Sequence, residues 1–415
     1  MIEYRTYTLP NGLRVVHNYD PATVMAAVDV LYNTGARDES RSLTGIAHLF
    51  EHLMFGGSRN VPDFDKVLQN AGGQSNAWTS NDFTNFYDVL PAANVATALY
   101  LESDRMEALG FNHEALEVQR SVVTEEFKQQ CLNRPYGLLM HTLREALYAP
   151  GHPYSWPVIG LAPEHIARVT DDDVRAWFYG HYAPDNAVLA ISGNVPYGEG
   201  RGMVERWFGD IPRRDIPARK NVDPGFPAES VSVELFGNAP MPMVALAIPM
   251  DSYGTKNYRV ADCITDILSA GQTSRFYRNL VLGGNGLIVD ADASITGSES
   301  PGFVMMTARV SQGTREALEE AAAAMLGQLE ALATDGGVTP HELERTMNRF
   351  ESTFALSNLD ALSKAQNLAM CVMHGEDINS TVELQRQITR GDIAAEAARL
   401  ASVPRATVFY RPKQS

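Results

Sequence analysis

The sequence has few cysteines, and those it has follow no pattern that would bind a metal or form a disulfide framework. Cys131, Cys263 and Cys371 lie far apart in a chain of 415 residues, and no pair has the C-x-x-C spacing. An odd, scattered set argues against a disulfide scaffold and against a cysteine-based zinc site. We therefore expect buried free thiols.

The sequence is also short of basic residues and of long apolar runs. Lysine and arginine total 34 against 50 aspartates and glutamates, so the formal net charge is −16. Because nucleic-acid binding needs a basic patch to neutralise phosphates, we expect no nucleic-acid partner. No apolar run approaches the ~20 residues of a membrane span, and the N-terminal segment does not read as a signal peptide. We expect no membrane segment and a cytoplasmic location, or a periplasmic one if a leader has been removed.

The length predicts more than one domain, because a single core usually stops growing near ~250–300 residues. A stretch rich in proline and charge marks a linker at 213–227, between an N-terminal domain at 1–212 and a C-terminal domain at 228–415. Consecutive strand-like runs mixed with helical periodicity favour the α+β class, with a mostly antiparallel sheet packed with helices in each domain. The second domain repeats the plan of the first.

Several segments have a clear local pattern. A hairpin is expected around the turn "PNG" near the N-terminus, and paired strands at 286–295 and 302–311. The segment "TGIAHLFEHLMF", residues 44–55, has helical periodicity, as does 113–131.

The first of these helices carries His48, Glu51 and His52 at positions i, i+3 and i+4, so the three side chains project from one face. Two histidines at this spacing can bind one metal ion, and a glutamate between them can take a proton from an activated water. Three ionisable groups in an otherwise apolar helix each need a partner, and one metal ion satisfies all three. We predict one Zn²⁺ per chain, with Glu51 as general base.

A catalytic zinc site usually has a third protein ligand. The helix at 113–131 offers two adjacent acids, Glu125 and Glu126. Glu126 has Val122 and Val123 as its i−4 and i−3 neighbours, which predicts that it lies on the apolar face, whereas Glu125 is rotated ~100° towards solvent. We predict Glu126 as the third ligand and keep Glu125 as the alternative.

These motifs resemble the H-x-x-E-H metallopeptidases of family M16, which includes pitrilysin, insulinase and the mitochondrial processing peptidase. The resemblance runs through most of the chain, from "LPNGLRVV" and "TGIAHLFEHLMFGGS" to "HPYSWPVIG" and "GQTSRFYRNLV". It implies two related α+β domains enclosing a substrate chamber with a partner chain. It also implies zinc ligation by His48, His52 and Glu126, and a supporting position at Gln119, where the family usually has glutamate.

The resemblance also assigns a substrate-binding strand and a missing part of the active site. "NAWTS" matches the edge strand that binds an extended peptide, with Asn76 and Ala77 contacting the peptide backbone. Active members supply an arginine and a tyrosine from the C-terminal domain, but the matching positions here fall near Val281 and Leu287, which cannot donate a side-chain hydrogen bond. Arg275 and Tyr277 lie earlier, in a motif that resembles a packing element.

The sequence therefore predicts a zinc endopeptidase subunit that forms a heterodimer with a homologous subunit carrying the Arg/Tyr pair. Its substrates are expected to be short or unfolded peptides. Two alternatives stay open. One is a self-sufficient homodimeric M16 peptidase, and the other, of a different class, is a non-catalytic structural or assembly subunit.

Overall fold

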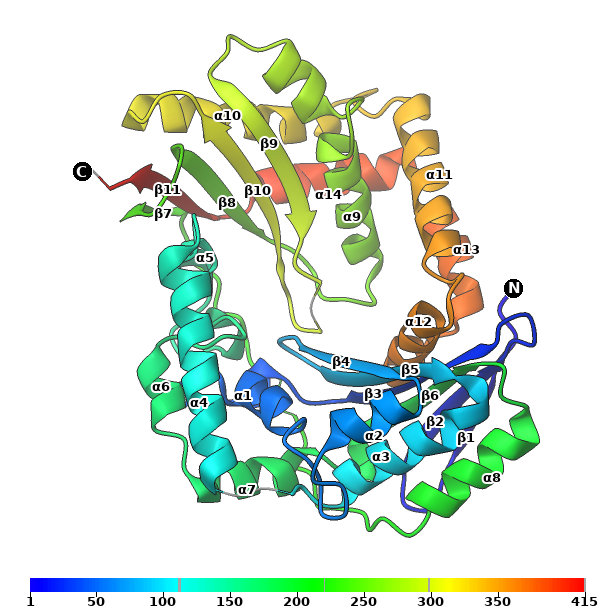
Figure 1. Cartoon of the computed structure of the whole chain (residues 1–415). Coiled ribbons are helices and arrows are strands. Elements are labelled where there is room, and N and C mark those ends of the chain that lie inside the picture. The colour runs from blue at the N-terminus through cyan, green and yellow to red at the C-terminus, as the bar shows by residue number, and fades with distance from the viewer. Residues whose placement is uncertain (111–112, 220, 298, 414–415) are drawn as a thin grey trace. The chain divides into compact units, whose positions relative to one another are not determined.

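The structure, a computed structural model, describes residues 1–110, 113–219, 221–297 and 299–413 (Figure 1). The chain divides into two compact units, each discontinuous in sequence. Unit 1 comprises Met1–Glu125, Val158–Lys220 and Thr353–Thr381. Unit 2 comprises Glu126–Pro157, Asn221–Ser352 and Val382–Ser415. Each unit is a mostly antiparallel sheet packed with helices, which confirms the predicted α+β class with two domains of similar size.

The sheet of unit 1 has the strand order β1-β2-β6-β3-β5-β4. Its strands are β1 (Arg5–Thr8), β2 (Arg14–Tyr19), β3 (Met25–Tyr32), β4 (Gln74–Thr79), β5 (Thr84–Pro91) and β6 (Ala187–Gly193). β2 and β6 are parallel, and every other pairing is antiparallel. The N-terminal hairpin is confirmed by the β1–β2 pair, and β4 forms one edge of the sheet as predicted.

Helices cover both faces of this sheet. α2 (Phe64–Asn70), α3 (Val95–Glu107) and α8 (Tyr197–Phe208) lie on one face, and α12 (Ala361–His374) packs across β3 and β6 on the other (Figure 1). The remaining helices of the unit are α1 (Ile46–Leu53), α4 (His113–Phe127), α6 (Pro163–Ala167) and α7 (Asp171–His181). Short 3₁₀ turns are η1 (Ala36–Asp38), η2 (Ala92–Asn94), η5 (Pro184–Asn186) and η7 (Ile378–Ser380).

The sheet of unit 2 has the order β7-β11-β8-β10-β9. Its strands are β7 (Val231–Gly237), β8 (Met243–Pro249), β9 (Ile288–Ile295), β10 (Phe303–Val310) and β11 (Ala406–Pro412). The β9–β10 pair is the one expected from 286–295 and 302–311, and only β7 and β11 run parallel among the described pairs. The helical segments are η3 (Lys128–Asn133), α5 (Leu139–Leu147), η4 (Pro153–Ser155), α9 (Lys256–Ser269), η6 (Phe276–Leu282), α10 (Arg315–Ala333), α11 (Pro340–Leu356), α13 (Thr381–Arg386) and α14 (Arg390–Ser402).

The two units differ from the predicted contiguous domains 1–212 and 228–415 in two segments. Residues 126–157 belong to unit 2, because the apolar side of α5 packs on β7, β11 and β8. Residues 353–381 belong to unit 1, because α12 packs on β3 and β6. The change of unit after Lys220 falls inside the predicted linker 213–227.

The three cysteines are free, as predicted, with Cys131 and Cys263 buried and Cys371 half-buried. Within the described ranges, no helix combines the length and the apolar character needed to cross a membrane.

Candidate metal centre

α1 is held at its N-terminus by a side chain from the preceding loop. Its cap, Gly45, has a φ of 88°, and a Cβ at this position would approach the Ile159 carbonyl oxygen to 2.9 Å. The Glu39 carboxylate accepts hydrogen bonds from the N–H groups of Gly45 at 2.9 Å and Ala47 at 3.0 Å. It thereby satisfies backbone donors that a helix start leaves unpaired, and its charge suits the helix dipole. These contacts fix the first turn of α1, which carries His48.

The two faces of α1 differ in chemistry and in burial. Its buried residues are apolar: Ile46, Ala47, Leu49, Phe50 and Leu53. His48, Glu51 and His52 are half-buried instead. The apolar run suggested that these three side chains lie on the core face of the helix. They lie instead on the opposite, half-buried side.

α4 carries the predicted third ligand in its last turn. The helix runs unbroken from His113 to Phe127, and the division between the units falls near its end, after Glu125. Glu126 is half-buried and Glu125 is exposed. The argument that placed Glu126 on an apolar face holds for Val123, which is buried, but is wrong for Val122, which is 45% exposed. The buried face of α4 therefore contains Val123 but not Val122.

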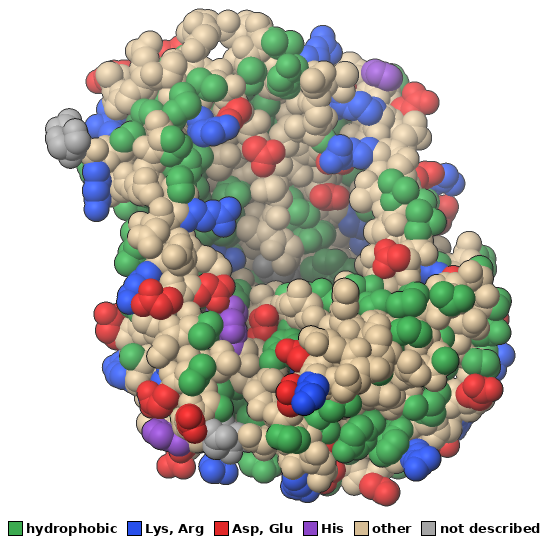
Figure 2. Space-filling model, viewed as in Figure 1, with side chains coloured by type: hydrophobic (Ala, Val, Ile, Leu, Met, Phe, Trp, Pro, Cys, Tyr) green, Lys and Arg blue, Asp and Glu red, His purple; other side chains and the backbone are tan. Residues whose placement is uncertain are grey.

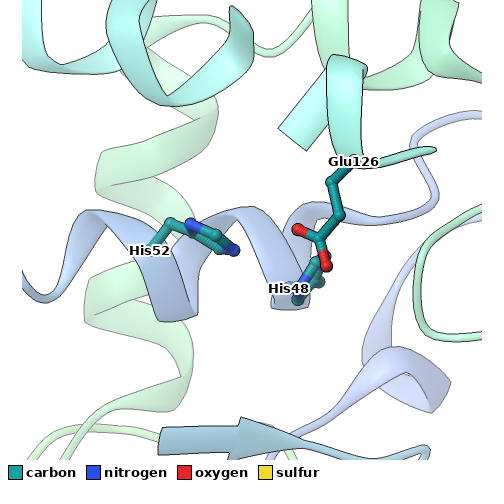
Figure 3. Close-up of side chains that lie close together, drawn as sticks. All are labelled: His48, His52 and Glu126. Atoms are coloured by element: carbon teal, nitrogen blue, oxygen red, sulfur yellow. The ribbon is translucent and has the colours of Figure 1, made fainter. Parts of the chain in front are cut away.

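The side chains of His48, His52 and Glu126 converge (Figure 3). One ligand atom from each lies within 4.8 Å of the others, and no other group of this kind is present among the described residues. Two imidazole nitrogens and a carboxylate oxygen are the donors that zinc takes in catalytic sites, so the residues fit the metal. Burial, together with neighbouring His52, lowers the pKa of His48 to about 4. Its imidazole is therefore neutral at pH 7, the form that binds metals.

Two hydrogen bonds hold the acidic residues of this centre, and sequence reasoning missed both donors. The Thr79 hydroxyl in β4 donates to Glu51 Oε2 at 2.5 Å. Gln130 Nε2 donates to Glu126 Oε1 at 2.7 Å. The only sequence signal for Thr79 is its place two residues after Ala77, which puts both side chains on one face of β4. Gln130 lies in η3, the π-helix that follows α4, and gave no signal.

The substrate-binding and supporting positions are also placed by the structure. Asn76 and Ala77 lie in the edge strand β4, where Asn76 Oδ1 accepts a hydrogen bond from the Ala77 N–H at 2.8 Å. That N–H therefore points away from β5, towards the open edge. Gln119 is half-buried on α4, and no hydrogen bond of its side chain is found in the described part of the chain. The roles of all three residues stay predictions.

The positions matched to the Arg/Tyr pair lie in apolar surroundings. Leu287 is buried in the core of unit 2, and Val281 packs against that core. Arg275 forms an ion pair with Glu342 at 2.7 Å, and Tyr277 is half-buried.

Comparison with known proteins identifies the family. Residues 14–152 match the domain described as insulinase, peptidase family M16. Residues 168–350 match the domain described as the peptidase M16 inactive domain. The chain belongs to peptidase family M16. The first match contains α1 and α4, and the second covers most of the remaining chain, so the candidate metal centre lies wholly in the first.

Similar proteins in M16 carry names that refer to zinc and proteolysis. The zinc protease PqqE of Helicobacter pylori is 27% identical over 93% of this chain and 86% of its own. A crystal structure of a protease from the same organism superposes with a TM-score of 0.88 at 25% identity, covering 99% of this chain and all of that one. The mitochondrial-processing peptidase subunit beta of Blastocladiella emersonii is 27% identical over 60% of this chain and 53% of its own.

Proposed function

We propose that this chain is the catalytic subunit of a zinc-dependent endopeptidase that hydrolyses short or unfolded peptides. The observation that carries the proposal is the convergence of His48, His52 and Glu126 beside Glu51. These three ligands would hold one Zn²⁺. When bound, zinc supplies a Lewis acid that polarises a peptide carbonyl and makes a water molecule acidic near neutral pH.

Glu51 is the general base in this proposal. It lies one residue from His52 on α1 and shares the half-buried side with both histidines, so a water that reaches the ligands also reaches its carboxylate. The Thr79 hydroxyl donates to Glu51 Oε2, and the carboxylate of Glu51 would take the proton. Thr79 therefore orients the carboxylate of Glu51.

The β4 edge is where the substrate would bind. An extended peptide can pair with an exposed strand edge through main-chain hydrogen bonds. The Ala77 N–H faces that edge and donates a hydrogen bond to Asn76 Oδ1. A carbonyl oxygen of the substrate would replace Asn76 Oδ1 as the acceptor. Thr79 follows two residues later on the same strand, so docking at Ala77 places the peptide next to the base.

A second subunit completes the site in this proposal. The positions of Val281 and Leu287 contribute only apolar side chains, and Arg275 is engaged by Glu342. A homologous M16 subunit carrying an Arg/Tyr pair would supply donors for the developing oxyanion. A homodimer whose second copy uses other donors is the alternative.

Peptide cleavage by the purified, zinc-loaded chain tests the proposal. An unstructured fluorogenic peptide is incubated with the wild type, with Glu51→Gln and with Glu125→Gln, and zinc content is measured for each by mass spectrometry. We expect about one zinc per chain in all three, with cleavage only where Glu51 is intact and only when a partner M16 subunit is present. Cleavage by the lone chain that depends on Glu51 would support the homodimer and contradict the need for a partner.

The non-catalytic alternative gives a different result in the same assay. A structural subunit would show no cleavage with any M16 partner, and Glu51→Gln would leave every measured property unchanged. Absence of bound zinc in the wild type would overturn the peptidase proposal altogether.

A further inference from the structure

A cavity of about 320 Å³ lies in unit 2, away from the candidate metal centre on the chain. It is formed between residues 273–279, which run into η6, and the first turns of α11. Its lining residues are Thr273, Arg275, Arg278, Asn279, Thr339, His341, Glu342 and Arg345. Three arginines and a histidine therefore face one glutamate, in a chain whose overall charge is −16. In Figure 2, a histidine lies at the upper right among Lys and Arg side chains and Asp and Glu side chains, where Figure 1 draws the start of α11.

Part of this cationic lining is already engaged. Arg275 pairs with Glu342 through Nε at 2.7 Å and Nη2 at 3.0 Å. Glu342 also accepts from the Thr339 backbone and hydroxyl, both at 2.9 Å, and so completes the cap of α11. The one acid of the cavity is thus saturated, and it neutralises one arginine.

The other two arginines keep their charge. Arg345 Nη1 donates to the Thr273 carbonyl at 2.8 Å and to its hydroxyl at 2.7 Å, which are both neutral acceptors. Asp266, which is outside the lining, pairs with Arg349 at 3.3 Å and also interacts electrostatically with Arg345. The Arg278 side chain is exposed and has no hydrogen-bond or ion-pair partner among the described residues.

The donors that stay available have the right chemistry for one class of ligand. A guanidinium presents five N–H groups in a fixed fork, which matches the oxygens of a phosphate. Thr273 orients the Arg345 side chain, so that side chain loses little conformational freedom when an anion binds. Arg278 and His341 line the same cavity and can act as further donors. The volume lies at the lower end of the range for small-ligand sites.

We propose that this cavity binds a phosphate-bearing small anion, with Arg278 and Arg345 as the principal ligands and His341 as a third donor. The site is independent of the peptidase proposal, because it shares no residue with the candidate metal centre or with β4.

Titration calorimetry with the full chain tests the site. The probes are inorganic phosphate, pyrophosphate and tripolyphosphate at constant ionic strength, with chloride as the filler salt. The variants are Arg278→Ala, which loses no partner in the described structure, and Arg349→Ala. Arg349 is the matched control, since it lies one helical turn beyond Arg345, outside the cavity, and its removal changes the net charge equally.

We expect saturable binding of one anion per chain, weakened about tenfold by Arg278→Ala and less than about twofold by Arg349→Ala. Binding of inorganic phosphate identifies a single phosphoryl group as the ligand, and binding of the condensed phosphates alone identifies a ligand with two or more. Equal weakening in both variants, or no saturable binding of any probe, would overturn the proposal. Unchanged thermal unfolding of Arg278→Ala shows that its effect is local.

Discussion

The two units share a strand plan and differ in what they build on it. In unit 1 the order β2-β6-β3-β5-β4 contains one parallel pair, β2 with β6, followed by antiparallel neighbours. In unit 2 the order β7-β11-β8-β10-β9 does the same, with β7 parallel to β11. In each, a helix follows the central strand, α1 after β3 and α9 after β8. The units are therefore two copies of one architecture.

The helices after the central strands carry different side chains. α1 presents His48, Glu51 and His52 on its half-buried side, whereas α9 presents Asp262 and no histidine. Both helices bury an equivalent apolar stripe, so the fold is satisfied in either case. The comparison shows that the sheet and its helices place the chemistry but do not require it.

The largest effect is expected from removing the carboxylate of Glu51, the base proposed on α1. Glu51→Gln should lower kcat for peptide cleavage by roughly 10³-fold with zinc retained, because an amide cannot take a proton. Asp262→Asn, which makes the corresponding carboxyl-to-amide change on α9, should leave kcat within a factor of about two. Comparable losses in both variants would show that the two helices contribute alike and would end the distinction between the units.

A second test separates the two acids of α4. Glu126→Gln should weaken zinc affinity by more than the ~10–100-fold typical of residues that only support a ligand. Glu125→Gln should leave affinity nearly unchanged, because that side chain is exposed. Competition with a chelating dye measures both. Loss of affinity in Glu125→Gln alone would move the third ligand to the other acid.

The third test concerns the link between β4 and α1. Thr79→Val removes the donor to Glu51 at nearly constant volume and should lower kcat about 10–100-fold, with KM and zinc content preserved. Thr79→Ser, which keeps the hydroxyl, should restore kcat. A kcat for Thr79→Val equal to that of the wild type would show that Thr79 is only a packing residue.

The fourth test concerns stability and again contrasts the two sheets. β3 buries the carboxyl of Asp29, whereas the corresponding run of β8, Val244–Ile248, is apolar. Burial raises the pKa of Asp29 to about 8, although the hydrogen bond from Asn85 opposes the rise. The folded protein thus holds a proton that the unfolded chain releases near pH 4. The stability that this proton contributes is complete at low pH and is lost as the pH rises towards 8.

Asp29→Asn should therefore stabilise the protein at pH 8, by up to about 5 kcal/mol, and the gain should shrink as the pH falls towards 4. Urea unfolding across this pH range measures the difference. A gain that does not vary with pH would show that the carboxyl titrates alike in both states. Ala247→Val in β8 serves as a control whose effect should not depend on pH.

Local patterns predicted the elements and most of the centre. The period of two in the N-terminal hairpin and in 286–295 with 302–311 follows from alternating side chains, and the structure confirms both pairings. The spacing of His48, Glu51 and His52 needs only one helical turn to bring them to one side. Helical periodicity led to the choice of Glu126 as the third ligand. The same periodicity predicted that Val122 is buried, and this was wrong, because the elements that pack against a helix decide how much of its surface is buried.

Partners distant in sequence could not be read in this way. Gln130 donates a hydrogen bond to Glu126 from a π-helix that the sequence pattern did not predict. Thr79 donates a hydrogen bond to Glu51, which lies 28 residues away in the sequence. The composition of the units was likewise hidden, since α5 and α12 each pack on a sheet that is not the one expected from their place in the chain.

The sequence by itself determined the fold class, the helix with its two histidines and glutamate, and the edge strand, because each depends on interactions within a few residues. Only the tertiary structure decided that Thr79 holds Glu51, that Arg278 and Arg345 share a cavity, and that the histidines lie beside the core and not within it. Those facts depend on which side chains of different elements contact each other, and the free energy of that packing cannot be derived from the residues of a single segment.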